Sequence, residues 1–216
     1  MTEQTNVVVV QGAWADGSSW GTVIPLLQQK GFNVTAAQSP LTSLADDIHV
    51  TQNLLAKQKG PTVLVGHSYA GAVISGAAND APNVAALVYT AAFGPDEGES
   101  LDSLSKQGPA PSGAASVLPP DDYGFLWIYR DGFPKAFAAD VDSVEARVMA
   151  SVQKPLSINS FTAKSGPPAW KHIRIVVHGR DRRSDDSATS RRIHGEENGC
   201  GSTEGSLQSC SHGFTP

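Results

Sequence analysis

The feature that most constrains this 216-residue chain is the segment 63–74, which reads VLVGHSYAGAVI. An apolar, β-branched run ends at Gly66, Ser68 follows two residues later, and small residues with helical spacing continue from Ala70. A nucleophile elbow requires this order: a strand, a tight turn that strains a serine, and a helix. The segment therefore predicts a nucleophile at Ser68. The alternative is a buried strand, turn and helix in which the serine is incidental.

Apolar runs of strand length alternate with helix-like segments through the first 94 residues. Such runs lie at 6–10, 32–36, 61–65 and 84–89. Continuous apolar runs suit parallel strands that are buried on both faces, and helices between them cover those faces. We therefore expect an α/β fold with a mostly parallel sheet and helices on both faces.

The pattern changes after residue 94, because no convincing buried strand follows before about residue 165. An insertion of this length is predicted to be a mostly helical cap. Its aromatic residues are expected to cover the mouth of the site or, alternatively, to form only the cap's own core; they are Tyr123, Phe125, Trp127 and Tyr129. The expected organisation is 1–94 for the N-terminal half of the core, 95–165 for the cap and 166–178 for a return to the core.

Composition excludes several classes of function. The net charge is −5 and no basic patch indicates nucleic acid. The apolar runs are too short for a transmembrane span, and the N-terminus lacks the basic region of a signal peptide. The two cysteines, Cys200 and Cys210, leave the first 199 residues without a disulfide, which favours a reducing, cytoplasmic setting. We expect no metal and no cofactor.

Three segments in order carry a family resemblance: VVVVQGAWADGSSWGTVIPLL, VLVGHSYAGAVI and LVYTAAFGPDEG. The chain resembles the α/β-hydrolases. It is most similar to the branch that includes plant methylesterases, hydroxynitrile lyases and their bacterial esterase relatives. The resemblance covers residues 6 to about 172 and implies the α/β-hydrolase fold with a helical cap.

The resemblance also implies roles for individual residues. Ser68 matches the family nucleophile, and the backbone N–H groups of Ala13 and Tyr69 match its two oxyanion-hole donors. Trp14 and His67 match positions near the pocket, although His67 is not expected to be the general base. Where the family usually has a histidine that braces the first loop, this chain has Gln11, which is expected to hydrogen-bond the loop instead.

The catalytic acid and base are not at their expected places near the C-terminus. Asp181 follows a strand-like run, and His194 and His212 are the late histidines, so these three are the fallback acid and bases. Residues 179–216 contain few apolar side chains. A segment that buries so little surface does not offset its ordering entropy, so we expect disorder there and no C-terminal strands.

A change of reading frame would explain this departure. From about Ile173 core residues thin out, lysine gives way to arginine and the expected triad members are absent. Permitted codons allow a neighbouring frame that reads VSWCMAATEDRTTPPPQGEFMAKRMGA, with a strand, an acid loop and a helix. We therefore hypothesise that the tail is frame-shifted, and sequencing codons 170 to 216 tests this. If the hypothesis fails, Asp181 with His194 or His212 completes the triad.

Three functions remain open at this point. The leading hypothesis is a serine hydrolase that acts on small carboxylic esters through an acyl-enzyme, with a small-molecule ester as its partner. One alternative is a hydroxynitrile lyase, which needs a cationic residue in the cap, for which Lys135 is a loose candidate. The other is a non-catalytic ligand-binding protein on a hydrolase scaffold. The sequence leaves the oligomeric state open.

Overall fold

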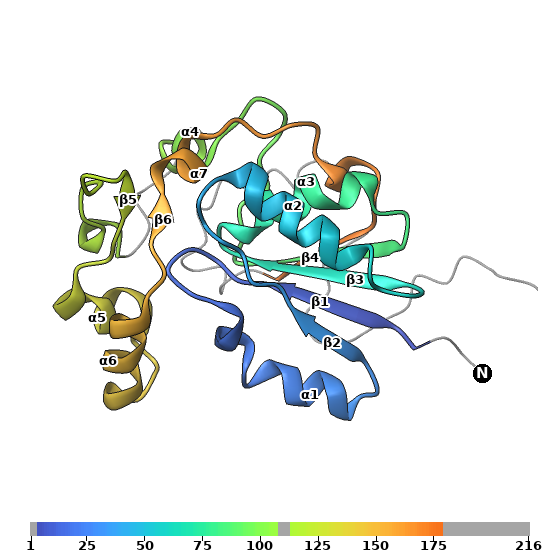
Figure 1. Ribbon diagram of the computed structural model, residues 1–216, viewed down its shortest axis with the longest axis horizontal. Coiled ribbons are helices and arrows are strands. Elements are labelled where there is room, and N and C mark those ends of the chain that lie inside the picture. The colour runs from blue at the N-terminus through green and yellow to red at the C-terminus, as the bar shows by residue number, and fades with distance from the viewer. Residues whose placement is uncertain (1–3, 108–112, 179–216) are drawn as a thin grey trace, which may run out of the picture.

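The main sheet of the computed structural model, which describes residues 4–107 and 113–178, consists of five parallel strands (Figure 1). Their order is β2-β1-β3-β4-β7. They are β1 (Asn6–Val10), β2 (Asn33–Ala36), β3 (Thr62–His67), β4 (Val84–Thr90) and β7 (Ile175–His178). β1 is buried at every position, as its continuous apolar run predicts for a strand with a neighbour on each side. The expected parallel sheet is confirmed.

Helices lie on both faces of the sheet (Figure 1). α2 (Leu44–Leu55) and α3 (Ala70–Ala77) cover one face, and α1 (Val23–Gln29) lies against the other. The core between the sheet and α3 contains completely buried side chains from both elements, among them Leu64, Ile74, Leu87 and Tyr89. The expected α/β-hydrolase architecture is confirmed in this part of the chain.

The segment between β4 and β7 consists of short helices separated by irregular chain, and fewer than half of its described residues are helical, which is less than the sequence predicted. It contains α4 (Leu101–Ser105), α5 (Phe133–Phe137), α6 (Ser143–Val152) and α7 (Ile158–Thr162). It also contains β5 (Phe125–Leu126) and β6 (Leu156–Ser157), which pair antiparallel. The sequence did not predict this ladder, because strands of two residues are too short to show a periodic pattern.

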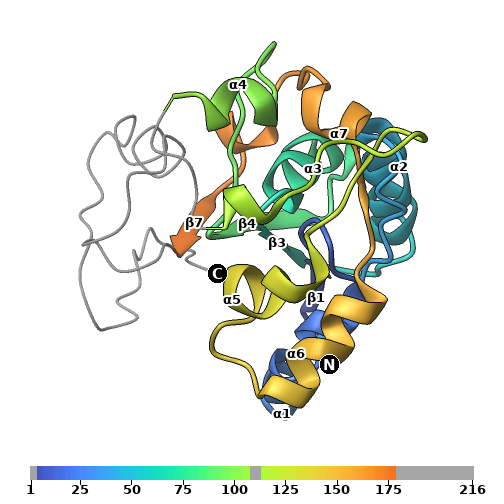
Figure 2. The same ribbon diagram turned by 90° about the vertical axis from the view of Figure 1, so that its left-hand side faces the viewer.

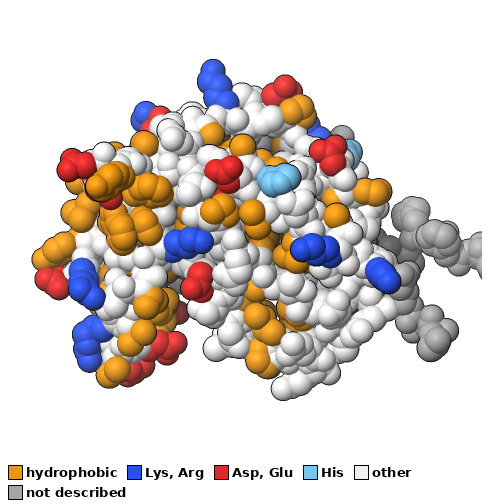
Figure 3. Space-filling model, viewed as in Figure 1, with side chains coloured by type: hydrophobic (Ala, Val, Ile, Leu, Met, Phe, Trp, Pro, Cys, Tyr) orange, Lys and Arg blue, Asp and Glu red, His pale blue; other side chains and the backbone are white. Residues whose placement is uncertain are grey.

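This cap lies beyond the carboxyl ends of the parallel strands, where α5, α6, β5 and β6 gather beside the sheet (Figures 1 and 2). It has its own small apolar cluster, which consists of Ile128, Phe133, Ala138, Ala146 and Ala150. Hydrophobic side chains also gather on its outer surface (Figure 3). The exposed ones include Val144, Val148 and Val152, which follow one another at four-residue intervals along α6.

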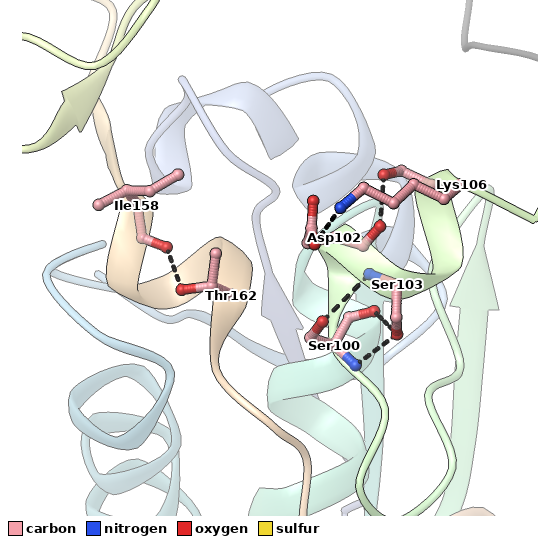
Figure 4. Close-up of polar contacts among 7 residues, drawn as sticks. Ser100, Asp102, Ser103, Lys106, Ile158 and Thr162 are labelled. Carbon is pink, nitrogen blue, oxygen red and sulfur yellow. Dashed lines mark hydrogen bonds and ion pairs between the residues drawn. The ribbon is translucent and has the colours of Figure 1, made fainter.

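Local side-chain bonds hold the short helices α4 and α7 (Figure 4). Ser100 and Ser103 form a capping box: Ser103 N donates to Ser100 Oγ at 3.1 Å, and Ser100 N donates to Ser103 Oγ at 2.9 Å. In α7, Thr162 Oγ1 donates to the Ile158 carbonyl at 2.9 Å. The capping box satisfies backbone N–H groups that a helix leaves unpaired at its N-terminus.

The predicted disorder and the missing C-terminal strands concern residues 179–216, which lie outside the described residues. Within the described residues, the return segment ends in β7, which pairs with β4 from Leu87↔Ile175 to Thr90↔His178. In residues 4–107 and 113–178, no helix has both the length and the apolar character needed to cross a bilayer.

Candidate active site

Ser68 lies at the turn between β3 and α3 with a left-handed backbone, φ 53°. A non-glycine residue seldom adopts this conformation, and such strain is concentrated at functional sites. The surrounding backbone holds it there. The Ser68 carbonyl accepts hydrogen bonds from Gly71 N at 3.1 Å and from Phe93 N at 3.0 Å. The residue is partly exposed, so the turn holds a strained serine that is not fully buried.

Two glycines make this turn possible. A Cβ on Gly66 would lie 2.9 Å from the Ala70 carbonyl oxygen, and a Cβ on Gly71 would lie 1.9 Å from that of Phe93. Both obstacles are backbone atoms, which cannot rotate away as a flexible side chain does. The small residues of the motif are therefore required by the close approach of strand, helix and the loop after β4.

The loop after β1 packs directly against the serine. A Cβ on Gly12 would lie 3.0 Å from Ser68 Cβ and 3.1 Å from the His67 carbonyl oxygen. Ala13 follows and is buried. Tyr69 precedes the first residue of α3, and its N–H therefore lies before the helix's own hydrogen-bond ladder. The fold thus brings together the backbone around the three residues Ser68, Ala13 and Tyr69.

Gln11 is buried and braces the loop from within. In the amide orientation that satisfies both of its polar atoms, Nε2 donates to the Ala37 carbonyl at 2.8 Å and Oε1 accepts from Ser39 N at 3.1 Å. The side chain therefore joins the end of β1 to the segment that follows β2. These two bonds are of the loop-bracing kind expected of Gln11.

Trp14 connects this loop to the cap. Its backbone is also left-handed, φ 61°. Its indole Nε1 donates to the Leu126 carbonyl at 2.9 Å, and its ring packs edge-on against Phe137 with the centroids 6.4 Å apart. The aromatic contact to the loop thus comes from α5. Two members of the predicted aromatic group, Tyr123 and Tyr129, are largely exposed instead.

A buried polar pair behind the elbow was not predicted from the sequence. The Tyr69 hydroxyl donates to Asp47 Oδ2 at 2.5 Å, and both residues are almost completely buried. Burial raises the pKa of Asp47, although the hydrogen bonds from Tyr69 and from Leu41 N act in the opposite direction. Burial and the neighbouring Asp47 carboxyl both raise the pKa of Tyr69, so the phenol stays neutral and donates. Asp47 lies on the buried face of α2 with Leu44 and Leu55. In the sequence, an aspartate at an apolar position of a helix was the feature that could have indicated this buried pair.

The remaining predicted site residues are not brought together in the described part of the chain. His67 Nδ1 would lie 3.3 Å from a Cβ on Gly12, so the ring adjoins the first loop. Lys135, the cation considered for a lyase, is exposed on α5. The fallback acid and bases, Asp181, His194 and His212, lie outside the described residues.

The end of β7 nevertheless lies at the edge of the sheet that carries Ser68. His178 is in register with Thr90, which is in register with His67, and the His178 carbonyl accepts from Ala91 N at 2.8 Å. The chain therefore leaves the sheet after His178 at the carboxyl ends of the strands. In open α/β sheets, ligands bind at this edge. Among the described residues, no three His, Cys, Asp or Glu side chains form a group that could hold a metal ion.

Comparison with curated proteins gives two relatives, one named a hydrolase and the other an esterase. The chain is 33% identical over 100 residues to the pyrethroid hydrolase of Sphingobium wenxiniae, covering 41% of this chain and 36% of the relative. It is 30% identical over 128 residues to the carbendazim hydrolyzing esterase of a Nocardioides species, covering 52% of each. The matched regions thus span about one third to one half of the length of these curated relatives.

A solved structure and a family model extend the comparison. The crystal structure of polyneuridine aldehyde esterase superposes with a TM-score of 0.71 at 17% identity, covering 88% of this chain and 86% of that one. The model of the alpha/beta hydrolase family matches residues 7–212. This range includes Asp181, His194 and His212 as well as the elbow. Because the match spans nearly the whole sequence, this chain belongs to the alpha/beta hydrolase family.

Proposed function

We propose that this protein is a serine hydrolase that cleaves small carboxylic esters with Ser68 as its nucleophile. The observation that carries the proposal is the strained backbone of Ser68, φ 53°, between β3 and α3 with Gly12 packed against its side chain. Strain that glycines and backbone bonds maintain on both sides is typical of a residue held for chemistry. The names of the two curated relatives, a hydrolase and an esterase, point in the same direction.

In the proposed reaction, Ser68 Oγ attacks the ester carbonyl carbon and a histidine takes its proton. The backbone N–H groups of Ala13 and Tyr69 stabilise the oxygen that gains negative charge. The histidine returns the proton to the departing alcohol, and an acyl-enzyme remains. Water, deprotonated by the same histidine, then attacks the acyl carbon; the bond to Ser68 Oγ breaks, the histidine returns the proton to Oγ, and the carboxylic acid leaves.

The acid and base of this scheme are proposed from the tail. Asp181 follows His178 by three residues, a distance that extended chain spans with about 10 Å. β7 ends at the edge of the sheet that carries Ser68, and this supports the proposal of Asp181 as the acid. His194 or His212 would be the base. Trp14 of the first loop packs against Phe137 of the cap, and this apolar contact favours esters with an apolar group.

Turnover of p-nitrophenyl acetate, measured with a Ser68→Ala control, tests the proposal. The wild-type chain should release p-nitrophenol and the variant should not. A fluorophosphonate should label Ser68 alone, and labelling that survives Ser68→Ala would show that the elbow is misassigned. A chain that binds esters but neither turns them over nor reacts with the probe would be the non-catalytic protein considered from the sequence.

A further inference from the structure

Asp47 binds one residue of the preceding loop, Leu41, and one residue of the elbow 22 positions later, Tyr69. Its Oδ2 accepts the Tyr69 hydroxyl hydrogen at 2.5 Å, and its Oδ1 accepts Leu41 N at 2.8 Å. All three side chains are at most 1% exposed. Both carboxylate oxygens therefore have a donor, and a buried carboxylate with two donors holds each of them in a fixed position.

Leu41 carries the connection onward to the cap. Its backbone is left-handed, φ 62°, and its carbonyl accepts from Ser157 N in β6 at 2.9 Å. Two residues earlier, the Ser39 carbonyl accepts from the Lys154 ammonium group. The loop that contains Ser39 and Leu41 is thus bound both by Asp47 and by the segment that returns from the cap, which contains Lys154 and Ser157.

Tyr69 is the residue whose backbone N–H matches an oxyanion donor. Its backbone amide belongs to the elbow, while the phenol at the end of its side chain binds Asp47 on α2. Donors to an oxyanion act only when they are held near the position that the oxygen takes in the transition state. The phenol bond restrains the rotation of residue 69 as a whole, and with it the direction of that N–H.

We propose that Asp47 is a positioning residue that fixes the backbone N–H of Tyr69, the oxyanion donor, by binding the phenol of Tyr69. Through Leu41, Asp47 also connects Tyr69 to Ser157 of the cap. This inference rests on the proposed function, because it assigns a consequence to the Tyr69 amide. It adds a residue on α2 that touches no substrate and acts through Tyr69.

Three variants separate positioning from simple stability. Tyr69→Phe keeps the ring and removes only the hydroxyl. Asp47→Asn keeps one acceptor for Leu41 N and offers an amide donor to the phenol oxygen, so the connection is rebuilt. Tyr89→Phe is the matched control, because the Tyr89 hydroxyl is also buried and pairs at 2.7 Å with the Oγ of Ser75, which lies farther along α3 and does not contact Tyr69 or Asp47 through this bond.

The experiment measures kcat and KM for p-nitrophenyl acetate, corrected for the folded fraction of each variant. Loss of a whole oxyanion donor lowers kcat by a factor of about 100 or more, so a misdirected donor should lower it about tenfold. We expect this fall in Tyr69→Phe with KM nearly unchanged, and wild-type kcat in Tyr89→Phe. Asp47→Asn, which keeps a partner for the phenol, should lose less kcat than Tyr69→Phe, and an equal or larger loss would overturn the inference that Asp47 acts through the phenol.

Two further results would overturn the inference: an unchanged kcat in Tyr69→Phe, or an equal loss in Tyr89→Phe. If the wild-type chain shows no turnover, the proposed function fails, and the positioning role is then decided by NMR. The backbone amide signals of Ala13 and Ser68 should shift in Tyr69→Phe and stay in place in Tyr89→Phe. Unshifted signals in both variants would show that the phenol does not position the elbow.

Discussion

The elbow region and the cap are held together in different ways. Around Ser68 most of the restraints are backbone atoms, namely carbonyls that meet Gly66 and Gly71 and amides that bind the Ser68 carbonyl, and the Tyr69–Asp47 side-chain bond adds to them. In the cap they are often side chains. Gln153 Nε2 donates to the Ile128 carbonyl at 3.0 Å, and Ile128 N donates back to Gln153 Oε1 at 2.9 Å. The proposed nucleophile thus lies in the elbow, where backbone contacts leave fewer bonds free to rotate than side-chain contacts do.

The two regions also bury apolar surface differently. The main core extends across the sheet, α2 and α3, whereas the cap's cluster has five fully buried members. Local opening needs less free energy where fewer apolar contacts are broken. We therefore expect the cap to open independently while the elbow remains folded, which would admit substrate without disturbing Ser68.

The largest expected effect comes from filling the tightest contact of the elbow. In Gly71→Ala the new Cβ would lie 1.9 Å from the Phe93 carbonyl oxygen. Because backbone must move, the free energy of unfolding should fall by about 3 kcal/mol and labelling of Ser68 should be lost. Urea denaturation and a fluorophosphonate probe measure both. Gly166→Ala, which meets nothing within 4 Å, is the control. Equal stability of the two variants would contradict the close approach.

Removing one helix cap from each region gives a smaller, paired test. Ser43 Oγ accepts from Asp46 N at 3.0 Å at the start of α2, and Ser100 caps α4. Each alanine variant should lose about 1 kcal/mol of helix stability. In Ser43→Ala this loss should lower the global free energy of unfolding, because α2 packs on α3. In Ser100→Ala it should appear mainly as faster hydrogen exchange in α4. A global loss in both would show that the cap unfolds together with the core.

One carboxyl group in each region, Asp47 near the elbow and Asp121 in the cap, should change the free energy of unfolding with pH in opposite directions. Burial raises the pKa of Asp47 above 3.8, so the folded state holds the proton more tightly and the contribution of Asp47 to stability falls as the pH rises from 3.8 towards the raised pKa. Hydrogen bonds from Phe125 N and Trp127 lower the pKa of Asp121, whose stabilising contribution is present above 3.8 and is lost as the pH falls through the lowered pKa.

Urea denaturation at pH 3 to 7 of wild type, Asp47→Asn and Asp121→Asn measures this difference. Relative to its variant, the wild-type free energy of unfolding should decrease with pH at Asp47 and increase with pH at the exposed Asp121. If this difference in the free energy of unfolding increased with pH at both positions, burial would not govern the protonation of Asp47.

The smallest change in overall stability is expected from cleavage within the cap. Residues 108–120 are rich in Pro, Gly and Ser, which is typical of a segment that proteases cut first. Limited proteolysis followed by mass spectrometry should place the first cut there while Ser68 stays reactive. First cleavage in α2 or α3 would reverse the expected order of stability between the regions.

The sequence by itself determined the order of strands and helices through β4, because continuous apolar runs and helical spacing are local patterns. It also determined the elbow: Gly66, Ser68 and Ala70 lie close together in the chain, and the turn follows from their sizes. The resemblance carried by three segments was enough to predict the family. The frame hypothesis and the acid and base in residues 179–216 remain predictions.

Only the tertiary structure decided which distant groups pack against the elbow and the first loop. Gly71 is required by the Phe93 carbonyl, Gln11 binds the segment at Ala37, and Tyr69 reaches Asp47 on another helix 22 residues away. None of these pairs follows from periodicity, because hydrogen bonds and close contacts between elements depend on register and crossing geometry. An aspartate on the apolar face of α2 indicates that a partner exists, but only the packing of α2 on α3 selects the phenol of Tyr69 as that partner.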